Sequence, residues 1–154
     1  MSHSLTKIWI HAVFGTKHGE PFINPSIEAQ IHAHIREHLE KDFECPVKAI
    51  NSMPNHLHIL FLLNVNFAVK DILKNIKGES SHWVNNGDLI KGKFAWQTGY
   101  GAFSVSESNV GKVEQYIRNQ KEHHRKHTFA NEYADFMKKH GLQFPGETDK
   151  SVLE

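Results

Sequence analysis

The sequence predicts one α+β domain in which antiparallel strands pair into a sheet and helices pack against it. Two observations predict this class. Segments with strand composition alternate with segments in which apolar residues recur at helical spacing. In addition, Pro54 and Asn55 separate two strand-like segments by a turn short enough for a hairpin. Strands that pair in this way, with helices covering one face, form an α+β sandwich.

The expected strands are short and are bounded by turn-forming residues. Residues 7–14 form the first strand, which Gly15 ends. Residues 47–53 and 57–63 form the two arms of the hairpin, and residues 101–105 fit a fourth strand. The pattern does not determine the order of the strands in the sheet.

Four helices are expected between and after these strands. Asn24 or Ser26 can cap the first, which runs to about residue 41 with an isoleucine or leucine at every fourth position facing inward. The other three occupy residues 67–83, 110–127 and 129–140. Residues 1–140 are therefore expected to form a single domain, and residues 141–154, with Pro, Gly and acidic residues, a flexible C-terminal tail.

Length and composition exclude several classes of protein. The chain has 154 residues, enough for a hydrophobic core, and its single cysteine, Cys45, allows no internal disulfide. No segment is apolar over the length that crosses a bilayer, and the N-terminus lacks an apolar signal region. A soluble, cytoplasmic protein is expected. The net charge of +1 does not by itself indicate nucleic-acid binding.

The most informative motif is His56-Leu57-His58 at the start of the third strand. Side chains alternate between the faces of a strand, so the two imidazoles project to one side and Leu57 to the other. Two neutral imidazoles at this spacing can share one divalent metal. Such a pair can also be two surface histidines. Histidine-triad hydrolases need a third alternating histidine, and Leu60 occupies that position.

Tyr116 and Gln120 lie four residues apart, on one face of the expected helix 110–127. Gln120 offers an oxygen of the kind that Mg²⁺ or Mn²⁺ accepts. The periodicity of Tyr116 alone fits a half-buried core residue. Beside a metal, however, its phenol oxygen can act as a nucleophile on a phosphodiester, and the phosphotyrosine formed conserves the energy of the bond that is broken.

Basic charge is concentrated around this helix. Residues 110–127 carry five lysines and arginines against two acidic residues. Arg118, Lys121, Arg125 and Lys126 are therefore candidates for contacts with DNA phosphates. A solvated helix face would have the same composition.

Several segments together resemble the IS200/IS605-type tyrosine (Y1) transposases, which are HUH (His-hydrophobic-His) endonucleases. The segments are FGTK at 14–17, MPNHLHILF at 53–61, IKGESS at 76–81, WQTGYGAFSVS at 96–106 and YIRNQKEHHRK at 116–126. The resemblance covers about residues 5–137. The related REP-associated transposases usually follow the tyrosine with an Asn-Pro pair. Here Gln120 follows Asn119, which favours the insertion-sequence branch.

The resemblance implies a fold, an activity and a set of site residues. The fold is an RRM-like (ferredoxin-like) antiparallel sheet with helices mainly on one face, plus a C-terminal helix carrying the catalytic tyrosine. His56, His58 and Gln120 would bind one divalent metal, Mg²⁺ or Mn²⁺. Tyr116 would attack single-stranded DNA at the hairpin ends of an insertion sequence, leaving a 5′-phosphotyrosine and a free 3′-hydroxyl. Members of the family act as homodimers in which the tyrosine can serve the partner's metal site.

Two other functions compete with this interpretation. An RRM-like sheet can bind nucleic acid without catalysis, although a pure binder has no use for a phenol four residues before an amide ligand. A replication-initiation or plasmid-transfer nuclease can carry the same metal triplet. The short chain and the GYGAFSVS segment at 99–106 weigh against that second alternative.

Overall fold

Four strands form one antiparallel sheet in the order β2-β3-β1-β4. The computed structural model describes residues 3–142, so nearly all of the expected C-terminal tail lies outside the described residues. The strands are β1 (Trp9–Gly15), β2 (Val47–Met53), β3 (His56–Leu62) and β4 (Gly101–Val105). The predicted hairpin is present, because β2 pairs with β3 across the Pro54-Asn55 turn.

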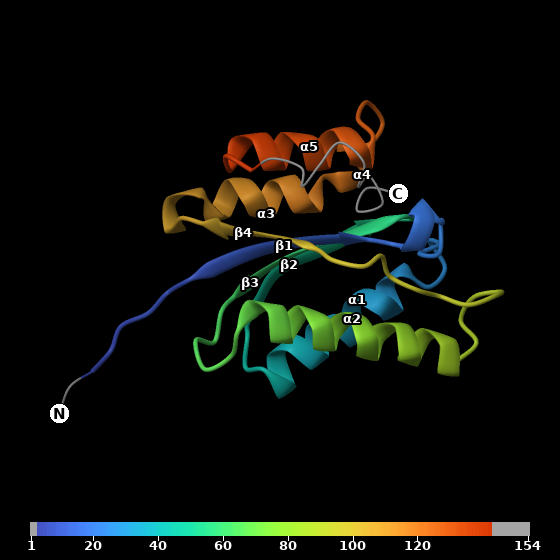
Figure 1. The fold of residues 1–154 in the computed structure, drawn as a ribbon, viewed down its shortest axis with the longest axis horizontal. Coiled ribbons are helices and arrows are strands. Elements are labelled where there is room, and N and C mark those ends of the chain that lie inside the picture. The colour runs from blue at the N-terminus through green and yellow to red at the C-terminus, as the bar shows by residue number, and fades with distance from the viewer. Residues whose placement is uncertain (1–2, 143–154) are drawn as a thin grey trace.

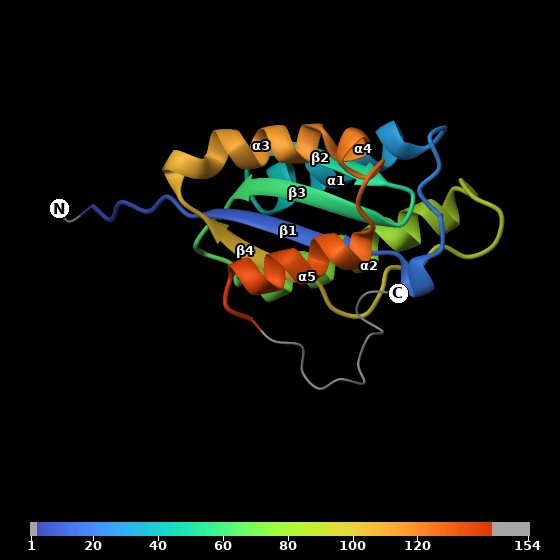
Figure 2. The same cartoon turned by 90° about the horizontal axis from the view of Figure 1, so that it is seen from above.

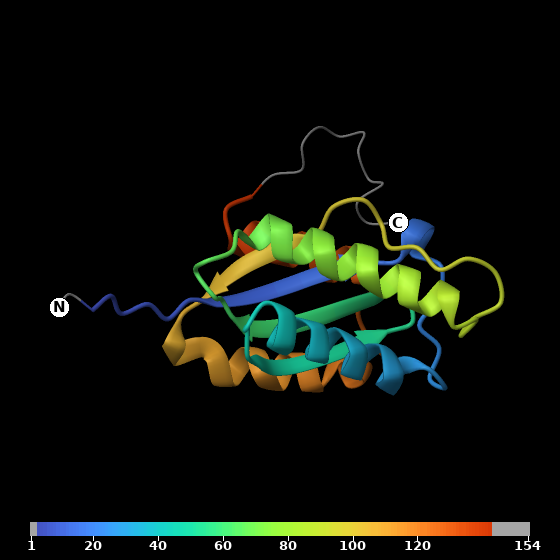
Figure 3. The ribbon, with the colours of Figure 1, turned by 90° about the horizontal axis from the view of Figure 1, so that it is seen from below.

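The helices lie in two layers, one on each face of the sheet (Figure 1). Below the sheet in that view are α1 (Glu28–Asp42) and α2 (Val69–Asn86), which Figure 3 shows side by side across the strands. Above it are α3 (Val110–Arg118), α4 (Gln120–His123) and α5 (Phe129–Lys139). Short 3-10 turns, η1 (Lys17–Gly19) and η2 (Glu107–Asn109), complete the order.

This arrangement confirms the predicted α+β fold and extends it. The order β1-α1-β2-β3-α2-β4, with β3 between β1 and β2, is the ferredoxin-like arrangement expected. Helices were expected mainly on one face of the sheet, and α1 and α2 lie together on one face. The C-terminal helices cover the opposite face, where α3 and α5 flank the central strands β3 and β1 (Figure 2).

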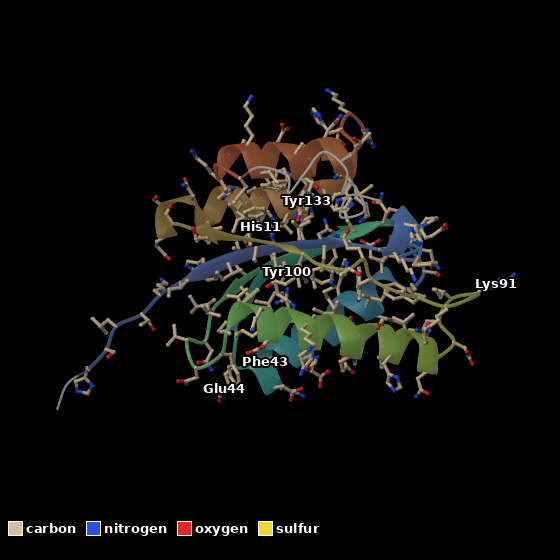
Figure 4. All side chains as sticks on the ribbon, in the orientation of Figure 1. His11, Phe43, Glu44, Lys91, Tyr100 and Tyr133 are labelled. Atoms are coloured by element: carbon tan, nitrogen blue, oxygen red, sulfur yellow. The ribbon has the colours of Figure 1, made fainter. Side chains whose placement is uncertain are left out.

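The apolar core lies mainly between the sheet and the layer of α1 and α2. Leu57, Ile59 and Phe61 of β3 are completely buried there, against the isoleucines and leucine predicted for α1. The alternation of side chains along β3 then turns residues 56, 58 and 60 toward the other layer. Figure 4 shows the same division for labelled residues: His11 and Tyr133 lie on the α3 and α5 side, and Phe43 lies below the sheet.

The predicted helix 110–127 is interrupted in the structure. Helix α3 ends at Arg118, and α4 begins at Gln120 after Asn119, whose φ of −95° and ψ of 20° are not helical. Asparagine is a poor residue for a helix interior, because its side chain competes for backbone hydrogen bonds. The break ends the straight run of α3 just before the segment that returns toward α5. Within residues 3–142, no helix is both long and apolar enough to span a membrane.

Candidate metal centre and tyrosine site

Strand β3 places the two predicted histidines side by side on the face that the C-terminal helices cover. His56 pairs with Gly15 of β1 and His58 pairs with Val13, so both lie on the inner strand β3, with His56 at its start. Their side chains are completely buried. The His-hydrophobic-His pattern therefore does what alternation predicts: Leu57 supports the core, and the two imidazoles face the opposite layer.

A hydrogen bond fixes the ring of each histidine. His56 Nδ1 donates to Asn55 Oδ1 over 2.7 Å, which leaves the lone pair on Nε2. His58 Nδ1 is 2.9 Å from Nε2 of His11, a buried residue of β1. Burial, together with the charge of His58, holds the pKa of His11 well below its usual value, and burial also lowers the pKa of His58. Neutral imidazoles of this kind are suited to metal binding.

Phe129, at the start of α5, covers the ring of His56. The two rings are stacked, with centroids 4.1 Å apart and planes 5° from parallel. The close fit depends on Gly15, since a Cβ there would lie 2.8 Å from Phe129 Cε2 and 2.5 Å from Gln97 Oε1. The glycine at the end of β1 thus allows α5 to approach the histidines closely.

The centre of the site is a residue that the sequence analysis missed, Glu132 of α5. Its side chain is buried, and its Oε1 lies 2.9 Å from His58 Nε2 and 3.2 Å from His56 Nε2. Burial raises the pKa of Glu132, but hydrogen bonds and charge interactions with His56 and His58 outweigh burial and bring the pKa to about 2. Glu132 is therefore a carboxylate at neutral pH.

A signal for Glu132 was present in the sequence. Phe129, Tyr133, Phe136 and Met137 repeat at helical spacing and form the stripe of α5 that packs on the sheet. Glu132 lies on the same stripe, where an acidic residue is unusual. A buried carboxylate is rarely tolerated without a cationic or hydrogen-bonding partner, so its position indicated a role.

Gln120 joins the same cluster from the first position of α4. It is completely buried, and its Oε1 is 3.4 Å from His56 Nε2. Its amide nitrogen lies 3.3 Å from Glu132 Oε2 and 3.4 Å from the backbone oxygen of Tyr116. The structure thus brings together all three residues predicted as metal ligands, with Glu132 added.

Tyr116 lies beside these residues in the same chain. Its hydroxyl donates a hydrogen bond to Glu132 Oε2, and its ring centroid is 5.7 Å from that of His58. The ring also borders a cavity of about 600 Å³ between α3, α5 and the end of β4. The predicted nucleophile is therefore half-buried, with its oxygen at the edge of the cluster and beside open space.

The cluster has the composition of a divalent metal site. In its neutral form, with the proton on Nδ1, His56 presents the Nε2 lone pair to two oxygens, Glu132 Oε1 and Gln120 Oε1, and a cation between these atoms would stabilise the arrangement. Ligand atoms that bind one metal at about 2.1 Å, with bonds at right angles, lie about 3 Å apart. The nitrogen-to-oxygen distances of 2.9 and 3.2 Å match that spacing.

The four basic residues predicted to contact DNA are all exposed, but three of them already pair with acidic residues. Arg118 lies 2.9 Å from Glu114, and Lys121 lies 2.5 Å from Glu28 of α1 and 3.0 Å from the backbone oxygen of Ser52. Arg125 lies farther from Glu122, at 3.4 Å. The lysines beside the cavity are different ones, Lys112 of α3 and Lys139 of α5.

Comparisons with known proteins identify a family and support the fold. The family model described as "Transposase IS200 like" matches residues 4–120. A crystal structure from Deinococcus radiodurans, assigned as a transposase, is 22% identical, with a TM-score of 0.61 over 78% of this chain and 95% of that one. A REP-associated tyrosine transposase bound to a REP hairpin is 16% identical, with a TM-score of 0.59 over 100% of this chain and 98% of that one. No curated protein matches the chain. At these identities the two solved structures establish the fold.

Proposed function

Because the chain belongs to the IS200-like transposase family, we propose that it cleaves and rejoins single-stranded DNA at the ends of an insertion sequence, with Tyr116 as the nucleophile. The observation that carries the proposal is the position of the Tyr116 hydroxyl. It lies in the same small cluster as His56 and His58, hydrogen-bonded to Glu132. A phenol, two imidazoles and a buried carboxylate have no common use in a protein that only binds nucleic acid.

Four residues would hold the divalent metal, which we take to be Mg²⁺ or Mn²⁺. His56, His58 and Gln120 are the set expected from the family, and Glu132 Oε1 lies within the same ligand spacing. When bound, the cation supplies a Lewis acid that polarises the scissile phosphate. His11 and Asn55 fix the histidine rings so that both Nε2 atoms face the cation.

Tyr116 would form the covalent intermediate. Its oxygen attacks the phosphorus of the scissile phosphodiester, the bond to the 3′ oxygen breaks, and a 5′-phosphotyrosine remains on the protein. The phenol gives up its proton, and the departing 3′ oxygen takes one up. Attack by a 3′-hydroxyl on the phosphotyrosine reverses the step and rejoins the strand without ATP. Glu132 Oε2 holds the hydroxyl in place through the hydrogen bond that it accepts.

The cavity beside Tyr116 supports a DNA substrate. Its volume of about 600 Å³ is enough for a nucleotide. One wall is aromatic, with Phe103 and Phe136, and Lys112 and Lys139 offer positive charge for phosphates. We propose that the strand next to the scissile phosphate enters here, and that Arg125 and Lys126 contact DNA outside the cavity.

Hairpin recognition and a homodimer complete the proposal. A solved structure with this fold is bound to a REP hairpin, and we extend hairpin binding to this chain. The dimer rests on the family resemblance. Since Tyr116 packs beside His58 and donates to Glu132 of its own chain, the proposed resting arrangement is in cis, and exchange of the tyrosine helix between subunits would be a later step.

The substitution Tyr116→Phe tests the proposed chemistry. The substrate is a single-stranded oligonucleotide that carries the hairpin and flanking sequence found beside the gene, incubated with Mn²⁺. We expect the wild type to form a covalent protein–DNA adduct that survives denaturing electrophoresis, and Y116F to form none. Hairpin affinity, measured by fluorescence anisotropy, is expected to stay within about twofold, because the ring and its packing remain.

Tyr100→Phe is the matched control, since Tyr100 is a partly buried tyrosine on the opposite side of the sheet. It should form the adduct as the wild type does. Adduct formation or strand cleavage by Y116F would refute the assignment of the nucleophile. Hairpin binding without an adduct in the wild type would instead favour a nucleic-acid binding module.

A further inference from the structure

Two more histidines face Glu132, at the carboxylate oxygen that His56 and His58 do not contact. His123 is the last residue of α4, and His124 follows it. The Nε2 atom of each lies 3.3 Å from Glu132 Oε2. The three ligand atoms lie within 4.8 Å of one another, as do those of His56, His58 and Glu132. Each oxygen of a single carboxylate thus faces its own pair of imidazoles.

The ring of His124 points at the carboxylate with an unused lone pair. Its Nδ1 lies 2.7 Å from the backbone oxygen of His127, to which it donates its proton. In the neutral ring, Nε2 then has no proton. This nitrogen is buried and has no hydrogen-bond partner among the described residues. Its nearest charged neighbour is an oxygen that is also rich in electrons, so the contact is repulsive unless a cation lies between the two atoms.

We propose that His123, His124 and Glu132 Oε2 bind a second divalent cation, so that Glu132 bridges two metals. Carboxylate-bridged metal pairs in enzymes lie about 3.5–4 Å apart, a span that one carboxylate covers. Two imidazoles and one carboxylate oxygen favour a transition-metal ion such as Mn²⁺ or Zn²⁺ over Mg²⁺, which prefers oxygen ligands.

The residues of this second site lie outside the segment of the chain that the family model matches. The family model matches residues 4–120, whereas His123, His124 and Glu132 all follow residue 120. The second site also touches the nucleophile, since the Tyr116 oxygen lies 3.4 Å from His123 Nε2. A cation bound there would lie next to the phenol and stabilise its deprotonated form.

The stoichiometry of Mn²⁺ tests the proposal without any activity assay. The full chain, free of any affinity tag, is dialysed to equilibrium against Mn²⁺, and the bound metal is measured by mass spectrometry. We expect two ions per chain in the wild type. The variants His123→Ala/His124→Ala and His56→Ala/His58→Ala should each bind one. The control His3→Ala/His82→Ala, which removes two exposed histidines outside the site, should bind two.

Electron paramagnetic resonance of the Mn²⁺-loaded protein supplies a second readout. Two bridged ions should give the spectrum of a coupled pair, and the His123→Ala/His124→Ala variant that of an isolated ion. The single variant His124→Ala, checked for folding by circular dichroism, covers the case in which the double variant does not fold, and it should also bind one ion.

The results distinguish this proposal from the proposed function, with which it shares Glu132. One ion per wild-type chain, kept by the His123→Ala/His124→Ala variant and lost by the His56→Ala/His58→Ala variant, overturns the second site and leaves the first intact. One ion with the opposite dependence overturns both the bridged pair and the metal site assigned to His56 and His58. Absence of bound Mn²⁺ in the wild type overturns both sites.

Discussion

At the scale of single residues, His11 shows how the site is held in place by a residue that would not itself bind the metal. Its Nε2 is 2.9 Å from His58 Nδ1, and its ring lies among Phe103, Tyr116 and Phe136. An outer hydrogen bond of this kind fixes the orientation of a ligating imidazole, and the loss of one typically weakens metal affinity. His11 is therefore a positioning residue.

Replacing His11 with phenylalanine tests this role. The aromatic surroundings can accept the new ring, but the hydrogen bond to His58 is lost. We expect the Kd for Mn²⁺, measured by calorimetry, to rise about 10- to 100-fold. His11→Gln, which restores an acceptor for the His58 Nδ1–H group, should recover part of the affinity, whereas a purely structural effect would not be rescued. His82→Phe, at an exposed histidine, should leave the Kd unchanged. Wild-type affinity in H11F would rule out the positioning role.

At the scale of elements, helix α5 decides whether the site is complete. Its residues Phe129, Tyr133 and Met137 pack against Val13 and Phe103 of the sheet. The first turn is capped by Thr128, whose Oγ1 accepts a hydrogen bond from the Asn131 backbone nitrogen over 3.2 Å. Because the apolar cluster that anchors α5 is small, the cap contributes to holding Glu132 at the histidines.

Thr128→Ala removes the cap, and the loss of such a cap costs about 1 kcal/mol. We expect the backbone amides of α5 to exchange with deuterium about fivefold faster in the metal-free protein, as a local opening free energy lowered by that amount implies. The amides of β1 and β3 should not change. Thr6→Ala, at an exposed threonine before β1, is the control. Unchanged exchange in α5, or equal acceleration throughout the sheet, would contradict the cap's role.

At the scale of the whole molecule, the two faces of the sheet have different roles: one stabilises the fold, and the other carries the candidate site. The face toward α1 and α2 carries a continuous apolar core, and the face toward α3 and α5 carries the polar cluster. A single strand, β3, contributes alternate residues to both. Substitutions of adjacent residues in this strand should therefore have different effects.

Leu57→Ala and His58→Ala test this separation in urea unfolding with and without Mn²⁺. L57A should lower the free energy of unfolding by about 2–5 kcal/mol, the usual cost of a buried leucine. Mn²⁺ at 100 times its Kd should stabilise the wild type by about 2.7 kcal/mol per site. L57A should keep that increment, because its metal ligands are intact, and H58A should lose the increment of the site that His56 and His58 form. A reduced Mn²⁺ increment in L57A would show that the two faces are coupled.

Much of the fold and part of the site follow from local pattern. The four strands, the hairpin at Pro54-Asn55 and the helix with its apolar stripe from Ile27 are fixed by periodicity within short windows, and the structure has them within a few residues. The break at Asn119 was not predicted, because one asparagine in a long periodic segment gives a weak signal. The second helical layer escaped prediction because periodicity gives an apolar stripe but not the face on which it packs.

The sequence by itself determined that His56 and His58 share one side of a strand and that Tyr116 and Gln120 lie one helical turn apart, a spacing that the structure keeps across the break at Asn119. Both follow from backbone geometry over a few residues. Only the tertiary structure decided that these two pairs meet, and that Glu132 lies between them. That meeting joins residues 64 and 74 positions apart, and it depends on how α5 packs against the sheet. Long-range packing is set by the shape of the whole core, which no short stretch of sequence contains.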